Sequence, residues 1–286
     1  MKIIDAHTHT FPDAIAPKVI PHLQAKAQSV AFTDGTDAAL QRSMEQAGIC
    51  TCIQLPVMTN AAQVVKLNDL AAAKNERFES TGLFSLGGMH PDFENPEKEL
   101  KRIAANGITG IKLHPAYQGM DLDDVRYVRI IDKACELSLA IVIHAGWDIG
   151  IMHHNFASVA HIQNVLRQIA PEKFVLAHMG GWKDWDEVEH ALCGENVYFD
   201  TSFSLGAYEP PQGITLPKEK TAMLSREQFQ RMVLKHGAEK ILFGSDSPWS
   251  DQQRAVQQIS SCGFSPEQEE YIFWRNAKEL FGIKNQ

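Results

Sequence analysis

Histidines mark the positions in this 286-residue chain where chemistry is most readily expected. Six of the 12 lie at or just after the ends of short apolar runs: His7, His9, His90, His114, His144 and His178. An imidazole at the end of a buried strand needs a polar partner, because burial removes its hydration. A divalent metal ion is one such partner. A hydrogen-bonded structural histidine is the alternative for each position taken singly.

A first group of candidate metal ligands combines histidine with aspartate. His7 and His9 are two residues apart in an apolar run, and residues with this spacing in a β-strand face the same side. His144 and His178 each follow another apolar run directly, and Asp246 follows a further run after Gly244 and Ser245. Nitrogen-rich ligation with one carboxylate suits Zn²⁺, with Mn²⁺ or Fe²⁺ as alternatives. The pattern therefore predicts a metal ion bound among these side chains.

Eight apolar runs can supply the strands that position these residues. The strands are predicted at residues 2–6, 51–55, 81–86, 110–113, 140–143, 174–177, 197–199 and 241–243. Amphipathic runs between them predict helices at 36–47, 61–77, 96–105, 124–138, 158–169, 185–192 and 226–236. Near-continuous apolar strands alternating with helices indicate a parallel sheet covered on both faces. We expect one (β/α)₈ barrel domain over residues 1–286 rather than an open doubly wound sheet, because no glycine-rich phosphate loop follows any strand.

Active sites of such barrels lie at the carboxyl ends of the strands, where the candidate ligands fall. Long loops are expected at 12–35 and 202–224, and loops of this kind often cap a site, although surface decoration is the alternative. A C-terminal helix is expected at 265–281, with Ser265 as its N-cap and Pro266 in its first position.

Composition limits the partners of the chain. Its formal net charge is -8 and it has no block of Lys and Arg, which disfavours nucleic-acid binding. Neither a leader segment nor an apolar stretch of roughly 20 residues is visible, so we expect no membrane association. The five cysteines are odd in number and irregular in spacing, which is typical of reduced thiols in a cytoplasmic protein.

Five motifs resemble those of the amidohydrolase superfamily. They are IDAHTH at 4–9, GIKLHP at 110–115, IHAG at 143–146, AHMGG at 177–181 and FGSDSPW at 243–249. Their order is similar to that of the amidohydrolase-related branch, which includes aminocarboxymuconate-semialdehyde decarboxylase. The resemblance implies a metal-dependent TIM-barrel enzyme with a small-molecule substrate, and relatives of this type often form homodimers.

The same resemblance implies roles for individual residues. His7, His9, His144 and Asp246 would be the metal ligands, and Asp246 would also carry a proton. His178 would assist the chemistry, or would bind a second ion as it does in two-metal relatives.

Lys112 has three interpretations, which the sequence leaves open. It would be carbamylated and bridge two ions, or contact a substrate carboxylate, or be structural. His114, Trp147 and Trp249 also follow strand ends and would contact the substrate, with ordinary loop packing as the alternative.

Hydrolysis is the reaction that this interpretation favours. The ion would lower the pKa of a bound water, Asp246 would accept its proton, and the hydroxide would attack a lactone, amide or related carbonyl of a carboxylated or cyclic substrate. Decarboxylation on the same ligands is the second hypothesis. A barrel that binds metal without catalysis is the third, and the additional inward base His178 argues against it.

Overall fold

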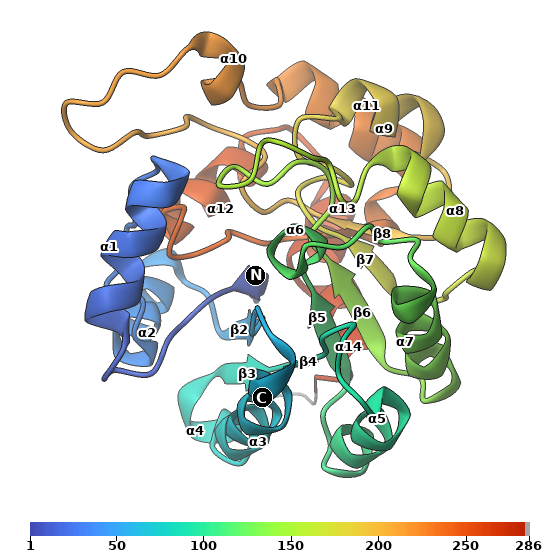
Figure 1. Cartoon of the computed structure of the whole chain (residues 1–286). Coiled ribbons are helices and arrows are strands. Elements are labelled where there is room, and N and C mark those ends of the chain that lie inside the picture. Colours follow the sequence, from blue (N-terminus) through green and yellow to red (C-terminus); the bar gives the residue numbers. More distant parts are fainter. Residues whose placement is uncertain (284–286) are drawn as a thin grey trace.

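The apolar runs form a ring of parallel strands in a computed structural model that describes residues 1–283 (Figure 1). Its strands are β1 (Ile4–Thr8), β2 (Thr51–Gln54), β3 (Leu83–Ser85), β4 (Gly87–Gly88), β5 (Gly110–Leu113), β6 (Ala140–Ile143), β7 (Phe174–Leu176), β8 (Tyr198–Asp200) and β9 (Ile241–Leu242). They pair in the orders β1-β2-β3 and β4-β5-β6-β7-β8-β9. The strands β3 and β4 are separated by one residue and together correspond to the third predicted strand.

Backbone hydrogen bonds connect the two ends of this series. The amide of Ala6 donates to the carbonyl of Phe243 at 2.8 Å, which places β1 beside β9. The amide of Leu86, between β3 and β4, donates to the carbonyl of Gln54 at 3.0 Å. The predicted (β/α)₈ barrel is therefore confirmed.

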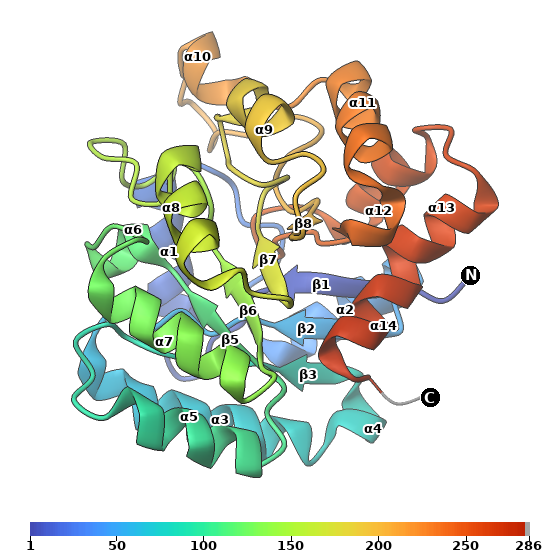
Figure 2. The same cartoon turned by 90° about the vertical axis from the view of Figure 1, so that its right-hand side faces the viewer.

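Helices cover the outside of the ring, as Figure 2 shows for α5, α7 and α8. The main helices are α2 (Asp37–Ala47), α3 (Val64–Asn75), α5 (Pro96–Ala105), α7 (Val125–Glu136), α8 (Val159–Ile169), α9 (Trp185–Ala191), α11 (Arg226–His236) and α12 (Gln252–Ser260). Several start where a polar side chain accepts a backbone amide, for example Thr36 before α2 and Ser158 before α8. None of the helices among residues 1–283 has the length and apolar character needed to span a membrane.

The segment 12–35 is not a loop throughout, which corrects the prediction. It contains α1 (Ala16–Ala27), which has Pro17 in its first turn and Pro21 inside. The first-turn proline is compatible with a helix, but Pro21 cannot donate to the carbonyl four residues earlier and therefore argues against a helix in the sequence. The segment 202–224 is irregular apart from α10 (Lys218–Thr221).

The C-terminal segment closes the end of the barrel at which the strands begin. It comprises α13 (Pro266–Glu270), a π-helical turn (Tyr271–Arg275) and α14 (Asn276–Phe281), and Ser265 forms the predicted N-cap. Phe281 of α14 is fully buried in one apolar cluster with Ile4, Val142 and Leu242 of the strands. Figure 2 shows α14 beside the starts of β1 and β2. The opposite end of the barrel, at the carboxyl ends of the strands, is not covered by this segment.

Candidate active site

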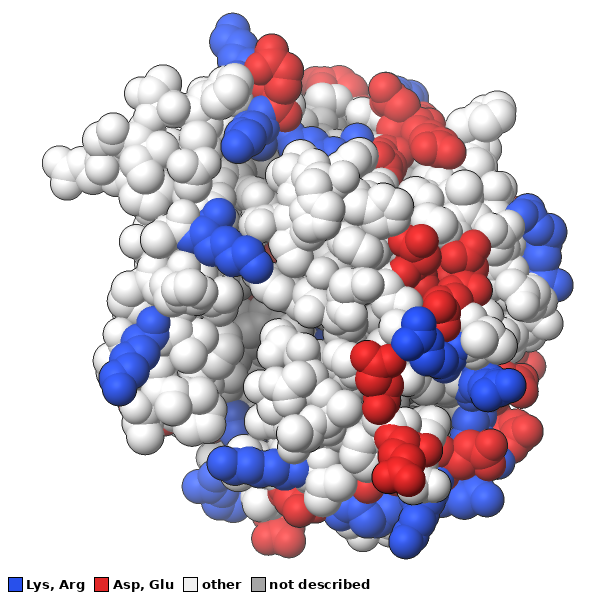
Figure 3. Space-filling view, viewed as in Figure 1, with Lys and Arg blue, Asp and Glu red and all other residues white. Residues whose placement is uncertain are grey.

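A cavity of about 500 Å³ opens at the carboxyl ends of the strands. Its polar lining includes His7, His9, Lys112, His114, His144, Asp148, His178 and Asp246. Much of the remaining wall is apolar or aromatic and includes Phe11, Ile15, Leu23, Trp147, Trp182 and Trp249. The face seen in Figure 3 is hollowed left of its middle, with a few separate basic side chains on that side, whereas most acidic side chains lie on the right, at the top and at the bottom. The cavity therefore combines a polar floor with walls suited to an apolar or aromatic ligand.

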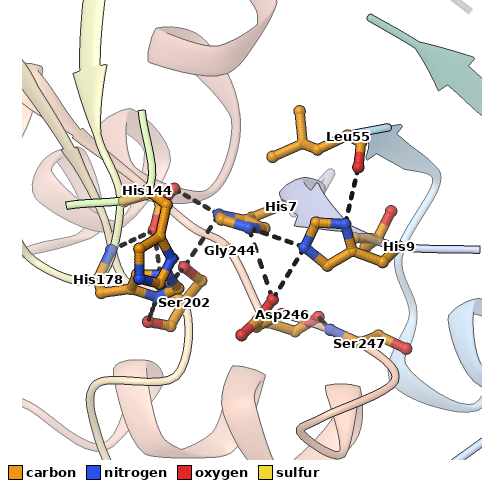
Figure 4. A network of polar contacts seen from close by, with 12 residues as sticks. His7, His9, Leu55, His144, His178, Ser202, Gly244, Asp246 and Ser247 are labelled. Atoms are coloured by element: carbon orange, nitrogen blue, oxygen red, sulfur yellow. Dashed lines mark hydrogen bonds and ion pairs between the residues drawn. The ribbon is translucent and has the colours of Figure 1, made fainter. Parts of the chain in front are cut away.

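Three of the four predicted ligands meet directly at this floor (Figure 4). His7 Nε2 lies 3.2 Å from His9 Nε2, and Oδ1 of Asp246 lies 3.5 Å from the first nitrogen and 3.2 Å from the second. We call these three residues the ligand triad. The amide of Asp246 donates to the carbonyl of His7 at 2.8 Å, so the loop after β9 is fixed to the end of β1.

The outer nitrogens of the two triad histidines are held by acceptors. His7 Nδ1 donates to Asp200 Oδ2 at 2.8 Å, and His9 Nδ1 donates to the carbonyl of Leu55 at 2.7 Å. Each ring therefore carries its proton on Nδ1 when neutral, and directs an unprotonated Nε2 toward Asp246.

Electrostatics favour a cation at this point. Burial lowers the pKa of His7 to about 4, and the charge of Lys112 adds to that effect, so this imidazole is neutral near pH 7. Burial alone would raise the pKa of Asp246, but its interactions with His9, His7 and His178 lower it below its ordinary value, so this carboxyl is ionised. Two nitrogen lone pairs and a carboxylate thus face one another, an arrangement that a divalent ion satisfies. The donor set fits Zn²⁺ or another divalent transition metal.

A second pair of histidines lies beside the triad. His178 Nδ1 donates to the carbonyl of Ser202 at 2.9 Å, and His144 Nε2 faces the carbonyl of Trp147 at 3.2 Å. The remaining nitrogens, Nε2 of His178 and Nδ1 of His144, face each other at 3.0 Å (Figure 4). Because both carbonyls only accept, each neutral ring carries its proton on the nitrogen next to the carbonyl. The two nitrogens that face each other then both present lone pairs, unless a proton or a cation lies between them. The rings of His178 and His7 are 5.3 Å apart between centroids, so the pair adjoins the triad.

Strained backbone positions these side chains at two loops. His178 and Asp246 have φ values of 59° and 70°, in the left-handed region that non-glycine residues seldom occupy. Such conformations persist where surrounding contacts hold them, and they cluster at functional sites.

Comparison with known proteins decides the family. Residues 4–283 match the amidohydrolase family, which is nearly the whole chain. This chain belongs to the amidohydrolase family. It is therefore a metal-dependent enzyme of the amidohydrolase superfamily, as its motifs predict. A search of curated proteins finds no significant match.

Solved structures share the fold at low sequence identity. A 2,6-dihydroxybenzoate decarboxylase bound to 2,6-dihydroxybenzoate has a TM-score of 0.71 and 14% identity, over 99% of this chain and 100% of that one. A dihydroxybenzoic acid decarboxylase from Polaromonas sp. JS666, with manganese and 2-nitroresorcinol, has a TM-score of 0.70 and 15% identity, over 100% and 98%. A putative 2-pyrone-4,6-dicarboxylic acid hydrolase from Pseudomonas putida has a TM-score of 0.64 and 19% identity, over 99% and 98%.

Within this amidohydrolase, the other predicted residues are placed as follows. His144 contacts His178 and has no direct contact with the triad among the contacts of residues 1–283, so its role as a ligand remains a prediction. His114 stacks on His144 with ring centroids 4.2 Å apart, and Trp147 and Trp249 line the cavity. His90 accepts the amide of Asp92 instead.

Lys112 is buried beside the triad. Its Nζ lies 3.5 Å from Nε2 of His7, and burial lowers its pKa to about 8 although the carboxylates of Asp200 and Asp246 oppose that shift. It has no carboxylate within ion-pair distance among the described residues. The amine is thus placed to meet a negative group that enters the cavity.

Sequence reasoning missed two carboxylates of the site. Asp200, at the end of β8, orients His7 and also accepts the amides of His178 and Ser202. It directly follows the seventh predicted strand, so the rule that identified the histidines could have found it. Asp148 lies in the loop after β6, 3.7 Å from Nε2 of His114, and burial raises its pKa to about 6. No local pattern in the sequence marks it.

Proposed function

We propose that this amidohydrolase removes carbon dioxide from a cyclic or aromatic carboxylic acid in a metal-dependent reaction. The observation that carries the proposal is the ligand triad on the floor of a cavity with tryptophan-rich, apolar walls. Such walls suit a planar ring, and they exclude water from a carboxylate that has to lose its hydration before it leaves. The decarboxylases among the structures of the same fold support this choice.

The triad of His7, His9 and Asp246 would hold the ion, and His144 would join them as the fourth predicted ligand. The ion would supply a Lewis acid that fixes an oxygen of the substrate. We propose Zn²⁺ from the two-imidazole donor set, with Mn²⁺ as the alternative because a structure of this fold holds manganese.

Side chains of the protein would then transfer one proton to the substrate. The bond between the substrate carbon and its carboxylate breaks, the electron pair stays on that carbon, and carbon dioxide departs. The carbon needs one proton in return: the carboxylate of Asp246 would accept a proton from solvent and then donate it to that carbon, which leaves Asp246 ionised again. His178 adjoins the triad and would relay this proton.

Lys112 would stabilise the charge of the substrate, and the aromatic walls would position its ring. The ammonium of Lys112 would stabilise the negative charge that grows on the substrate as carbon dioxide leaves. Trp147 and Trp249 would hold the ring so that its carboxylate meets the floor. In this scheme Lys112 contacts the substrate and is not carbamylated.

Hydrolysis is the second candidate, and it is the reaction that the sequence favours. The same triad could serve it, and a putative 2-pyrone-4,6-dicarboxylic acid hydrolase shares the fold. We place decarboxylation first because of the apolar walls and the decarboxylases of the same fold.

The two reactions leave different products. We would measure the metal content of the purified protein and supply substituted benzoates labelled with ¹³C in the carboxyl, and 2-pyrone carboxylates in H₂¹⁸O. Labelled carbon dioxide supports the proposal, whereas ¹⁸O in the product without carbon dioxide supports hydrolysis. Asp246→Asn should abolish turnover, and the matched control His90→Gln should not, because His90 pairs with a loop amide. A metal-free protein, or full activity in Asp246→Asn, would overturn the scheme.

A further inference from the structure

Besides the ligand triad and a group of His114, His144 and Asp148 in the cavity, a further cluster of potential metal ligands lies outside the cavity lining. Asp121 precedes α7, His154 lies in the loop between β6 and α8, and His161 is in the first turn of α8. One ligand atom from each lies within 4.8 Å of the other two. Oδ1 of Asp121 lies 2.6 Å from Nε2 of His154 and 3.7 Å from Nε2 of His161. We call these residues the rim cluster.

A second layer of contacts orients His161. Its Nδ1 donates to Oδ1 of Asp123 at 2.8 Å, and Asn164 donates to the other oxygen of Asp123 at 2.6 Å. Because the carboxylate only accepts, the ring proton lies on Nδ1 and the neutral ring directs a lone pair from Nε2 toward Asp121. A carboxylate that holds the far nitrogen of a ligating histidine is the usual outer contact of a protein metal site.

In the rim cluster, two hydrogen-bond acceptors therefore face each other: Oδ1 of Asp121 and Nε2 of His161. Oδ1 of Asp121 accepts from Nε2 of His154 when that nitrogen carries a proton, whereas the Nε2 lone pair of His161 faces the same oxygen with no proton between them. A cation bound here would replace the His154 proton and meet three acceptors. No Lys or Arg forms an ion pair with Asp121 or Asp123 within residues 1–283, and their ionic contacts are to histidines alone.

The two loops that carry the cluster are joined independently of any ion. The amide of Leu122 donates to the carbonyl of Phe156 at 2.8 Å, and the ring of Phe156 packs against His154 with centroids 4.5 Å apart. Ligands about 2.0–2.2 Å from a tetrahedral ion lie about 3.4 Å from one another, so small side-chain rotations would complete the geometry. The site is thus partly formed before a metal arrives.

We propose that Asp121, His154 and His161 bind a divalent transition-metal ion of the Zn²⁺ class, separate from the catalytic ion, with Asp123 orienting His161. The fourth position is open to water because His154 and Asp121 are 47% and 40% exposed. The bound ion clamps the segment before α7 to the loop between β6 and α8.

The test uses the full chain and Zn²⁺ alone. Zinc per chain would be measured by mass spectrometry after equilibrium dialysis at a fixed free zinc concentration. The variant His154→Gln/His161→Asn removes both imidazoles and leaves polar side chains at two positions that are exposed or partly exposed, so the fold should be retained. The control His153→Gln/His190→Asn removes two exposed histidines outside the cluster.

The cluster variant should hold about one zinc ion fewer than the wild type, and the control should match the wild type. Zinc should also slow amide hydrogen exchange at residues 121–124 and 154–161 in the wild type but not in the cluster variant. Equal zinc in all three proteins would overturn the proposal, as would exchange unaffected by zinc. Both readouts are independent of turnover, so this site and the catalytic proposal fail separately.

Discussion

Replacing Asp200 by Asn should weaken metal binding without removing a ligand. Oδ2 of Asp200 accepts Nδ1 of His7 at 2.8 Å. Its Oδ1 accepts the amides of His178 and Ser202 at 3.0 and 3.1 Å and the Ser202 hydroxyl at 2.5 Å. Burial alone would raise the pKa of Asp200, but its electrostatic interaction with His7 and the hydrogen bond from Nδ1 of that ring lower it well below its ordinary value. It is therefore an ionised acceptor.

An asparagine has only one oxygen to replace these two acceptors. The two backbone amides and the Ser202 hydroxyl retain that oxygen, so the NH₂ group turns toward Nδ1 of His7. That nitrogen then has to accept, and the ring proton moves to Nε2, which faces Asp246 in the triad. Loss of such an outer contact typically lowers metal affinity 10- to 100-fold, which is about 1.4–2.7 kcal/mol.

Competition with a chelator of known affinity would measure this change. The dissociation constant for Zn²⁺ should rise roughly 10- to 100-fold in Asp200→Asn, the range typical for loss of an outer contact to a ligating histidine. Ser202→Ala is the matched control, because it removes one donor to the same carboxylate and leaves the tautomer of His7 unchanged. An Asp200→Asn protein that binds Zn²⁺ within about twofold of the wild type would refute the tautomer argument.

Three further predictions concern stability and turnover. Burial lowers the pKa of His236 to about 4, below the 6.5 of the unfolded chain, so its contribution to stability is complete above pH 6.5 and declines as the pH falls toward 4. When the pH is lowered from about 7.5 to 5, the unfolding free energy of the wild type should fall by about 2 kcal/mol more than that of His236→Gln. Urea titrations at both pH values would measure this, and the same decrease in both proteins would contradict the prediction. Phe281→Ala should lower the unfolding free energy by about 3–5 kcal/mol while zinc content is unchanged, because Phe281 is fully buried at the far end of the barrel. Asp246→Asn should lower kcat at least about 100-fold in the carbon dioxide assay, and a smaller loss would remove Asp246 from the proton step.

The fold could be predicted from the sequence because its signals are local. The run at 140–143 has no polar residue, and β6 spans the same residues, since a strand covered on both faces is apolar throughout. The helix α1 could not be predicted in this way. Its prolines argue against a helix, and only tertiary contacts, such as burial of Ile20, favour one.

In the site, too, some features follow from local sequence and others depend on residues distant in the chain. His7 and His9 share a face because of their spacing, but the register of β1 against β2 shifts between Asp5 and Thr8. Asp5 consequently contacts Gln252 of α12 while His7 contacts Asp200, although simple alternation would give both side chains one face. The direction of each imidazole is decided by acceptors distant in sequence, Asp200 for His7 and the carbonyl of Leu55 for His9. Residue type and spacing can therefore identify the histidines of the triad, whereas their protonation, on which metal binding depends, follows only from the folded structure.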